Sequence, residues 1–250
     1  MPSTSETGHA KNVANFEDLI SFCNGYGAPY NPSKDALTIA KLTDLQTQAK
    51  GGLQQSKTAK TSFDNATNTR QLAFKDLKTL ATKIVNALAV SGATALAVAD
   101  AKTINRKIQG AKANGGSKTP APPADPNAPT PTDKTISTSQ QSYDSLIDHF
   151  AKLIEVVSQD ANYKPNEKEL QTATLQIKLD SLKTSNTDIV NTYTVWSNAR
   201  INRNTILYNP VTGLVQTALE VKKYVKSVFG AGSPQFKQVS GLEFTNVKDR

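Results

Sequence analysis

The sequence repeats itself after 133 residues, and this repeat constrains the fold more than any other feature. Residues 28–32 (APYNP) return as residues 161–165 (ANYKP). At the same offset and without a gap, residues 63–66 (FDNA) return as residues 196–199 (WSNA). A chain that uses one sequence pattern twice is expected to use one structural module twice.

The module reads as a series of helices, because apolar residues recur at steps of three and four and the breaks contain Gly or Pro. One helix is expected near 14–25, where Gly25 and Gly27 end it. The first copy then predicts helices over about 34–75, 77–90 and 94–111, and the second copy predicts them over about 142–158, 166–208 and 211–229. Residues 235–250 fit either a short helix or an extended tail.

The long helix of the first copy carries small residues on its apolar face, such as Ala49, Ser56 and Ala59. Small side chains at these steps let two helices approach closely, as in coiled coils. Gly51 and Gly52 lie within this helix, where each weakens it by about 1 kcal/mol relative to Ala. We expect a kink or a close helix crossing there rather than a loop.

The predicted fold class is all-α, an elongated bundle of two short-helix, long-helix, return-helix modules related by a pseudo-two-fold axis. Residues 1–13 read as a polar tail, 14–113 as the first repeat and 142–250 as the second. Residues 114–141 contain six of the 12 prolines and predict an extended linker. Such a linker permits both repeats to pack as one bundle.

The sharpest local pattern is an aromatic residue, an Asn and an Arg that occur in both copies. Phe63 and Arg70 are seven residues apart and therefore share a helix face. Where the two copies meet, the aromatic ring would pack, and the Arg would stack on it or bond to the Asn amide. The candidate repeat-interface residues are Phe63, Asn65, Arg70, Trp196, Asn198 and Arg203. A ligand pocket at this place is the alternative.

The residues that carry most enzyme chemistry are scarce. The two histidines, His9 and His149, read as ordinary surface or helix-start residues, and the single cysteine, Cys23, reads as a small core residue. No phosphate-binding loop, dinucleotide fingerprint or metal-ligand spacing is present. We therefore predict no catalytic residues, no metal, no cofactor and no small-molecule ligand, and a protein that is not an enzyme.

The stretch from Ile84 to Ala99 contains no charged residue. It is shorter than the ~20 residues a membrane-spanning helix needs, which favours a buried helix pair. The alternative is a concealed membrane-inserting hairpin of the kind found in helical pore-forming toxins. A net charge of +8 permits weak nucleic-acid binding, but the lysines are spaced singly, as on a solvated helix surface.

The N-terminal residues contain no apolar stretch of the kind that a secretory signal needs, so the default expectation is a cytoplasmic protein. Export through a leaderless route stays open. Residues 8–16 (GHAKNVANF) and 25–33 (GYGAPYNPS) resemble uncharacterised helical proteins of Bacteroidota, the flavobacteria and their relatives. That resemblance implies a duplicated helical chain of bacterial origin and brings no activity with it.

These patterns favour a non-enzymatic helical bundle with a structural or protein-interaction role, acting through a protein partner or self-association. A pore-forming, membrane-active component is the first alternative, and a weak non-specific nucleic-acid binder is the second.

Overall fold

The computed structural model describes residues 4–110 and 141–247, with side chains from residue 8 onward. The predicted linker over 114–141 lies outside these residues except for Gln141, which donates from Nε2 to the carbonyl of Lys107 at 2.7 Å.

The described chain is all-helical, as predicted. Two of its elements are single 3₁₀ turns, named η1 and η2, and the rest are α-helices. In order they are α1 (Thr4–Gly25), η1 (Asp35–Leu37), α2 (Ile39–Phe74), α3 (Leu77–Val90), α4 (Ala95–Gln109), α5 (Tyr143–Gln159), η2 (Lys168–Leu170), α6 (Thr172–Tyr208), α7 (Leu214–Phe229) and α8 (Pro234–Ser240).

Several helix ends follow from local capping chemistry. The hydroxyls of Thr94, Ser142 and Ser233 each accept a backbone N–H at the start of α4, α5 and α8. These bonds satisfy amides that have no partner within the helix. Gly110 ends α4 at a φ of 76°, a conformation that suits glycine. The C-terminal segment is therefore a short helix, α8, followed by seven residues without helix.

Both long helices begin about five residues later than predicted, because a 3₁₀ turn precedes each. The Tyr30 hydroxyl donates to the carbonyl of Leu37 at 2.7 Å, and the Tyr163 hydroxyl donates to that of Leu170 at 2.9 Å. A carbonyl bonded to a tyrosine is held in the turn, so the regular helix starts beyond it.

The prediction of a polar tail over residues 1–13 is corrected, since α1 begins at Thr4. His9, Asn12 and Val13 are buried in this helix. The side chain of Asn12 donates to the carbonyl of Thr245 at 2.8 Å and accepts its N–H at 3.0 Å. Polar residues can be buried where such bonds replace water, and the sequence gives no sign of a partner 233 residues away.

The chain divides into two compact units that differ from the two sequence repeats. Unit 1 consists of Met1–Asp64 and Asn191–Arg250, and unit 2 consists of Asn65–Val190. Each unit therefore combines the first part of one repeat with the last part of the other. The division falls within α2 and within α6, so each long helix contributes to both units.

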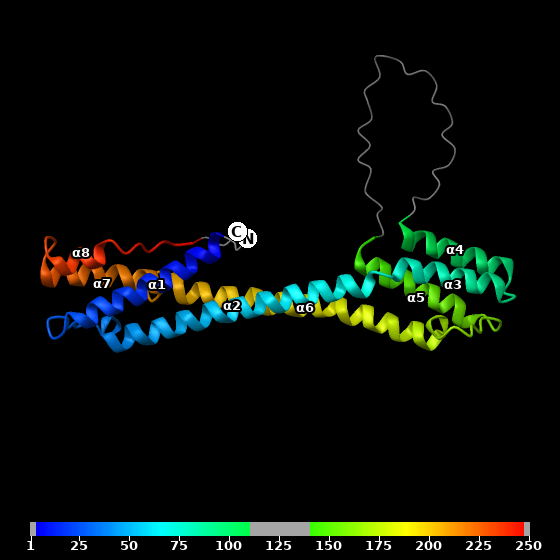
Figure 1. The fold of residues 1–250 in the computed structure, drawn as a ribbon, viewed down its shortest axis with the longest axis horizontal. Helices are drawn as coiled ribbons and strands as arrows, with labels where there is room; N and C mark the ends of the chain where they lie inside the picture. Colours follow the sequence, from blue (N-terminus) through cyan, green and yellow to red (C-terminus); the bar gives the residue numbers. More distant parts are fainter. Residues whose placement is uncertain (1–3, 111–140, 248–250) are drawn as a thin grey trace, which may run out of the picture. The chain divides into compact units, whose positions relative to one another are not determined.

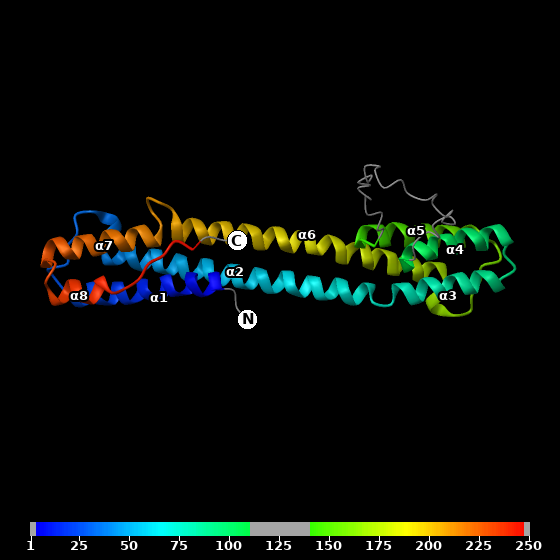
Figure 2. The same cartoon turned by 90° about the horizontal axis from the view of Figure 1, so that it is seen from above.

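In unit 1, α1, α7 and α8 lie side by side, and α7 also packs on η1 (Figures 1 and 2). The apolar face of α1 supplies Phe16, Leu19 and Cys23 to the core, all of which are buried. α7 supplies the facing side of this core with Leu214, Ala218, Val221 and Val225.

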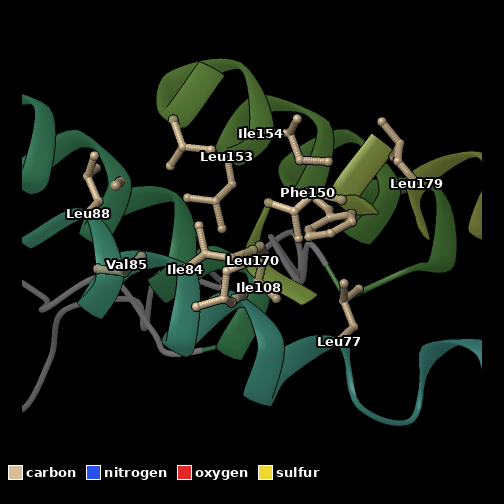
Figure 3. Packing of buried hydrophobic residues seen from close by; sticks show 14 of the residues in the cluster. Leu77, Ile84, Val85, Leu88, Ile108, Phe150, Leu153, Ile154, Leu170 and Leu179 are labelled. Carbon is tan, nitrogen blue, oxygen red and sulfur yellow. The ribbon is translucent and has the colours of Figure 1, made fainter. Parts of the chain in front are cut away.

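In unit 2, α4 packs against both α3 and α5, and α3 also contacts η2. Figure 3 shows Ile84 of α3, Ile108 of α4 and Phe150 of α5 meeting in the core. All three side chains are fully buried. Burying such a side chain contributes about 1.5–3 kcal/mol.

Several contacts recur 133 residues apart. The N–H of Leu37 donates to Lys34 O and that of Leu170 to Glu167 O, both at 2.9 Å. Further along, the N–H of Leu42 donates to Thr38 O at 2.9 Å and that of Leu175 to Gln171 O at 3.0 Å. The buried positions Ala81, Ile84, Val85 and Leu88 of α3 correspond at this offset to Leu214, Thr217, Ala218 and Val221 of α7, which are also buried.

At Gly51 and Gly52, α2 is a continuous helix, and Gly52 marks a close helix crossing, one of the two predicted alternatives. A Cβ at Gly52 would lie 3.3 Å from Ile206 Cδ1 and 3.5 Å from Arg203 Cα of α6. A Cβ at Gly51 would meet nothing within 4 Å. The two glycines are therefore a matched pair, one against α6 and one in open space.

Substitution of the two glycines should separate helix propensity from packing. Gly51→Ala should raise the free energy of unfolding by about 0.5–1 kcal/mol, because Ala favours helix over Gly. Gly52→Ala should gain less, and Gly52→Leu should lose about 1–3 kcal/mol through overpacking against α6. Urea unfolding followed by circular dichroism measures each change. A Gly52→Leu protein as stable as the unaltered protein would contradict the close crossing.

Candidate functional site

Phe63 and Trp196, two of the predicted repeat-interface residues, lie together in unit 1. Their rings stack with centroids 5.4 Å apart and an interplanar angle of 20°. Tyr193 packs edge-on against both, at 5.7 Å from Phe63 and 6.0 Å from Trp196. We call Phe63, Tyr193 and Trp196 the aromatic cluster. It joins α2 to α6 in this unit.

Two cations lie close to the Trp196 ring of the aromatic cluster. Lys60 Nζ lies 5.3 Å from the Trp196 ring centroid, and Arg200 Cζ lies 5.2 Å from it. Lys60 is also paired with Asp64 at 2.5 Å. Contacts of this kind contribute about 0.5–1 kcal/mol at exposed sites. The aromatic cluster is therefore a half-buried packing site, and the positive charges of Lys60 and Arg200 lie close to its Trp196 ring.

Arg70 and Arg203 have different partners from those predicted. In unit 2, Arg70 Cζ lies 4.0 Å from the Tyr143 ring centroid, and its guanidinium donates to Asn186 Oδ1 at 3.0 Å. In unit 1, Arg203 is fully buried and donates to Asn204 Oδ1 and to Ser56 Oγ. Arg70 therefore does contact an aromatic ring and an Asn amide, as predicted in kind. These belong to Tyr143 and Asn186 and not to the residues of the repeated pattern.

Asn65 and Asn198 are exposed on α2 and α6. The repeat therefore brings together the two aromatic rings of its pattern, whereas its asparagines face solvent. The rotation of a helix explains this difference, because Asn65 lies two residues from Phe63 and so on another face.

Both histidines are buried, which corrects the prediction of surface residues. His9 Nδ1 lies 2.5 Å from the Tyr208 hydroxyl, and the Asn12 side chain reaches the same hydroxyl at 3.3 Å. His149 of α5 is buried with Nδ1 3.8 Å from a carboxylate oxygen of Asp148. Burial lowers the pKa of His149, although Asp148 opposes this effect. A neutral imidazole is thereby favoured in the core of unit 2.

The buried nucleophile and phenols are held in their neutral forms. Burial raises the pKa of the Cys23 thiol to about 12, although a hydrogen bond with Tyr30 opposes the shift. Burial also raises the pKa of Tyr163 to about 12, with the Glu167 charge as a second cause. A thiol that stays protonated at neutral pH is a poor nucleophile, so Cys23 acts as a core residue.

Unit 2 contains an open groove of about 720 Å³ between α3 and the chain from Asn162 to Leu170. Its lining includes Lys83, Ala87, Ser91, Tyr163, Lys164 and Glu167. The groove lies within the range of about 300–1,000 Å³ that is usual for ligand sites. The sequence patterns described above did not predict this groove. A signal was present, however, since residue 91 is a Ser where residue 224, at the repeat offset, is a Tyr.

Two kinds of site are absent from residues 4–110 and 141–247. No group of three or more His, Cys, Asp and Glu side chains in these ranges is arranged to hold a metal ion. No helix in the same ranges combines the length and the apolar character that crossing a bilayer requires.

No family model matches the chain, and neither the curated proteins nor the solved structures contain a match.

A double-mutant cycle will measure the contact between Phe63 and Trp196. Phe63→Ala and Trp196→Ala should each lower the free energy of unfolding by about 1–2 kcal/mol, less than in a full core because the rings are half-buried. The coupling between the two changes should be about 0.5–1.5 kcal/mol. Circular dichroism during urea unfolding provides the readout. Val195→Ala, an exposed neighbour, should change stability by less than about 0.5 kcal/mol, and additive single effects would argue against the stack.

His149 should make stability depend on pH below its ordinary pKa of 6.5. Because burial lowers the pKa in the folded state, the unfolded chain binds the proton first as the pH falls. The contribution of the neutral imidazole is therefore fully present above pH 6.5 and declines below it. His149→Gln should flatten this decline in urea unfolding between pH 7 and pH 5. Phe150→Leu should lower stability equally at every pH, and an unchanged slope in His149→Gln would refute the assignment.

Proposed function

We propose that this chain is a non-enzymatic interaction protein, built from two copies of one helical module, that binds a protein partner through α6. Support for the duplication comes from the hydrogen bonds and buried positions that recur at an offset of 133 residues. A duplicated helical scaffold offers two related surfaces, and a partner can be recognised where those surfaces differ.

The observation that carries the proposal is a set of exposed apolar side chains on α6. In unit 1, Val195 is 59% exposed, Ile201 is 62% exposed and Tyr193 is 50% exposed. Ile177 and Val190 in unit 2 are exposed as well. The residues 133 positions earlier, on α2, are all polar or charged: Asp44, Lys57, Lys60, Ser62 and Asn68.

The fold does not require apolar side chains at these exposed positions of α6. Their presence therefore needs another explanation. Exposed polar residues at these positions are compatible with a long helix, as α2 demonstrates. Covering apolar side chains contributes about 25 cal/mol per Å² removed from water, so a partner would gain at these positions of α6 and not at the matching positions of α2. Groups of exposed apolar residues on a protein surface often mark interaction sites.

The membrane-active alternative receives less support. Ile84, Val85 and Leu88, in the first part of the uncharged stretch, are core residues of unit 2. Val90 and Leu96, at the turn between α3 and α4, are 86% and 80% exposed. Inserting the stretch into a bilayer would therefore require the core of unit 2 to open first, whereas α6 can bind a protein without any unfolding.

The nucleic-acid alternative also receives less support. Among the described residues, six lysines pair with carboxylates at 2.9 Å or less: Lys11, Lys34, Lys50, Lys60, Lys83 and Lys152. Phosphate binding draws on basic side chains gathered on one surface. Here positive charge alternates with negative charge, which weakens the attraction for a polyanion.

A surface variant tests the proposal. Val195→Ser combined with Ile201→Asn places on α6 the residues that α2 carries at the matching positions. The double variant should stay folded, because both side chains are exposed, and should lose at least tenfold in partner affinity. Affinity capture from source cells, followed by titration of the captured protein, measures the loss, while light scattering measures self-association.

Ser62→Ala combined with Asn68→Ala on α2 is the matched control and should bind as the unaltered protein does. If the α6 variant captures the same partners and has the same oligomeric state as the unaltered protein, the proposed surface is wrong.

A further inference from the structure

Residues 241–247 (GLEFTNV), which we call the strap, follow α8 and run along α1 without forming a helix (Figure 1). Leu242 and Phe244 are half-buried against the core of unit 1, whereas Glu243 and Thr245 are exposed. Side chains that alternate in this way belong to an extended chain. Unit 1 therefore already holds one extended peptide segment, its own.

α1 holds the strap with a row of small and polar residues, Gly8, Asn12 and Asn15, which share one helix face. Asn12 Nδ2 donates to the carbonyl of Thr245 at 2.8 Å, and Asn12 Oδ1 accepts the N–H of Thr245 at 3.0 Å. Asn15 Nδ2 donates to the carbonyl of Glu243 at 2.7 Å. All three bonds go to main-chain atoms of the strap, so they recognise an extended backbone rather than one particular side chain.

The side chain of Phe244 has a defined place on unit 1. Its ring packs edge-on against Phe16, with centroids 6.5 Å apart and an interplanar angle of 85°. Lys222 Nζ lies 5.4 Å from the centroid of the same ring and donates to the carbonyl of Leu242. This position therefore favours an aromatic residue, which offers a cation the face of its ring.

Two further contacts lie on either side of Phe244. A Cβ at Gly8 would lie 2.8 Å from Val247 Cγ2, so the glycine makes room for the valine. Glu243 pairs with Lys11 at 2.9 Å, and these two side chains are 72% and 60% exposed. Exposed ion pairs contribute little to stability, so part of the hold on the strap is weak, as displacement requires.

Asn12 is prepared for the strap by its surroundings. It is 1% exposed, and its Nδ2 also lies 3.3 Å from the Tyr208 hydroxyl, which orients the amide. Phe16 recurs as Phe150 at an offset of 134, and the same offset matches Asn12 with Leu146. There α5 is covered by a helix, α4. A buried asparagine in place of leucine is explained by the main chain that it binds, because a buried amide is costly without such bonds.

We propose that this part of unit 1 binds an extended segment of a partner protein with the pattern apolar–acidic–aromatic, and that the strap occupies the place until such a segment displaces it. We call it the strap site, and it consists of Gly8, Lys11, Asn12, Asn15, Phe16 and Lys222. The partner's apolar and aromatic residues take the places of Leu242 and Phe244, and its acidic residue pairs with Lys11. Its main chain takes the bonds of Asn12 and Asn15.

A partner protein is favoured over a second copy of this chain. Two copies that exchange straps would make the same contacts that each chain makes alone, and they would pay the entropy of association. A different chain can add contacts beyond the strap site and so compete with the strap. The inference rests on the proposed interaction role, but it concerns a surface separate from the exposed apolar residues of α6.

A released variant tests the site. Phe244→Ala combined with Thr245→Pro removes the ring and the N–H that Asn12 accepts. A capped peptide of sequence GLEFTNV, labelled for fluorescence anisotropy, should bind this variant with a dissociation constant of about 10–100 µM. The unaltered protein should bind it at least about tenfold more weakly, because the strap competes at an effective concentration in the millimolar range. Asn246→Pro, at an exposed neighbour, is the matched control and should bind as the unaltered protein does.

The recognition is tested from both sides. Peptides with Ala for the Phe, or Lys for the Glu, should bind the released variant at least about threefold more weakly. Adding Asn12→Leu to that variant should abolish binding, whereas Asn24→Leu, at the other end of α1, should preserve it. Circular dichroism checks that each variant is folded.

The absence of saturable binding to the released variant, or equal binding of all three peptides, would overturn the proposal. Equal binding by the unaltered protein would show that the strap does not compete. If light scattering shows a dimer of the unaltered protein that the peptide dissociates, the occupant is a second copy and the choice of partner is wrong. Loss of peptide binding with capture through α6 intact would count against the strap site alone.

Discussion

The packing of each long helix depends on an apolar cluster near its ends. In the described chain, no buried hydrophobic side chain lies between Ala59 and Phe74 of α2, or between Leu182 and Leu207 of α6. The buried residues in those intervals are polar: Ser185 and Arg203. Apolar burial is the main source of stability, so the clusters of the two units hold the helices while their middle parts make little apolar core.

The sequence predicted the ends of some helices but not the pairing between distant parts of the chain. The ends of α3 and α4 were predicted closely, because Ser91, Gly92 and Gly110 interrupt the helical pattern. Which segments of the chain come together in each unit was not predictable in the same way. Periodicity tells which face of a helix is apolar, but the first part of α2 packs with the last part of α6, and that pairing depends on contacts far apart in the chain.

The candidate residues show the same limit. The aromatic rings of Phe63 and Trp196 meet, because burying aromatic area is favourable against almost any apolar partner. Arg70 and Arg203 were harder to assign. A guanidinium needs specific acceptors, and Asn186 and Ser56 meet it only once α2 and α6 have taken their register. The groove was missed because one Ser for one Tyr resembles ordinary surface divergence.

Such divergence sets the two halves of the repeated sequence apart at exposed positions. The core positions of α3 and α7 keep their burial, and losing a buried side chain costs about 2–5 kcal/mol, so little can change there. Exposed positions tolerate substitution within about 0.5 kcal/mol, which leaves them free to acquire contacts with other molecules. α6 exposes Val195 and Ile201 where α2 exposes Ser62 and Asn68. The valine and isoleucine of α6 leave apolar surface in contact with water, and covering it with another molecule would gain free energy.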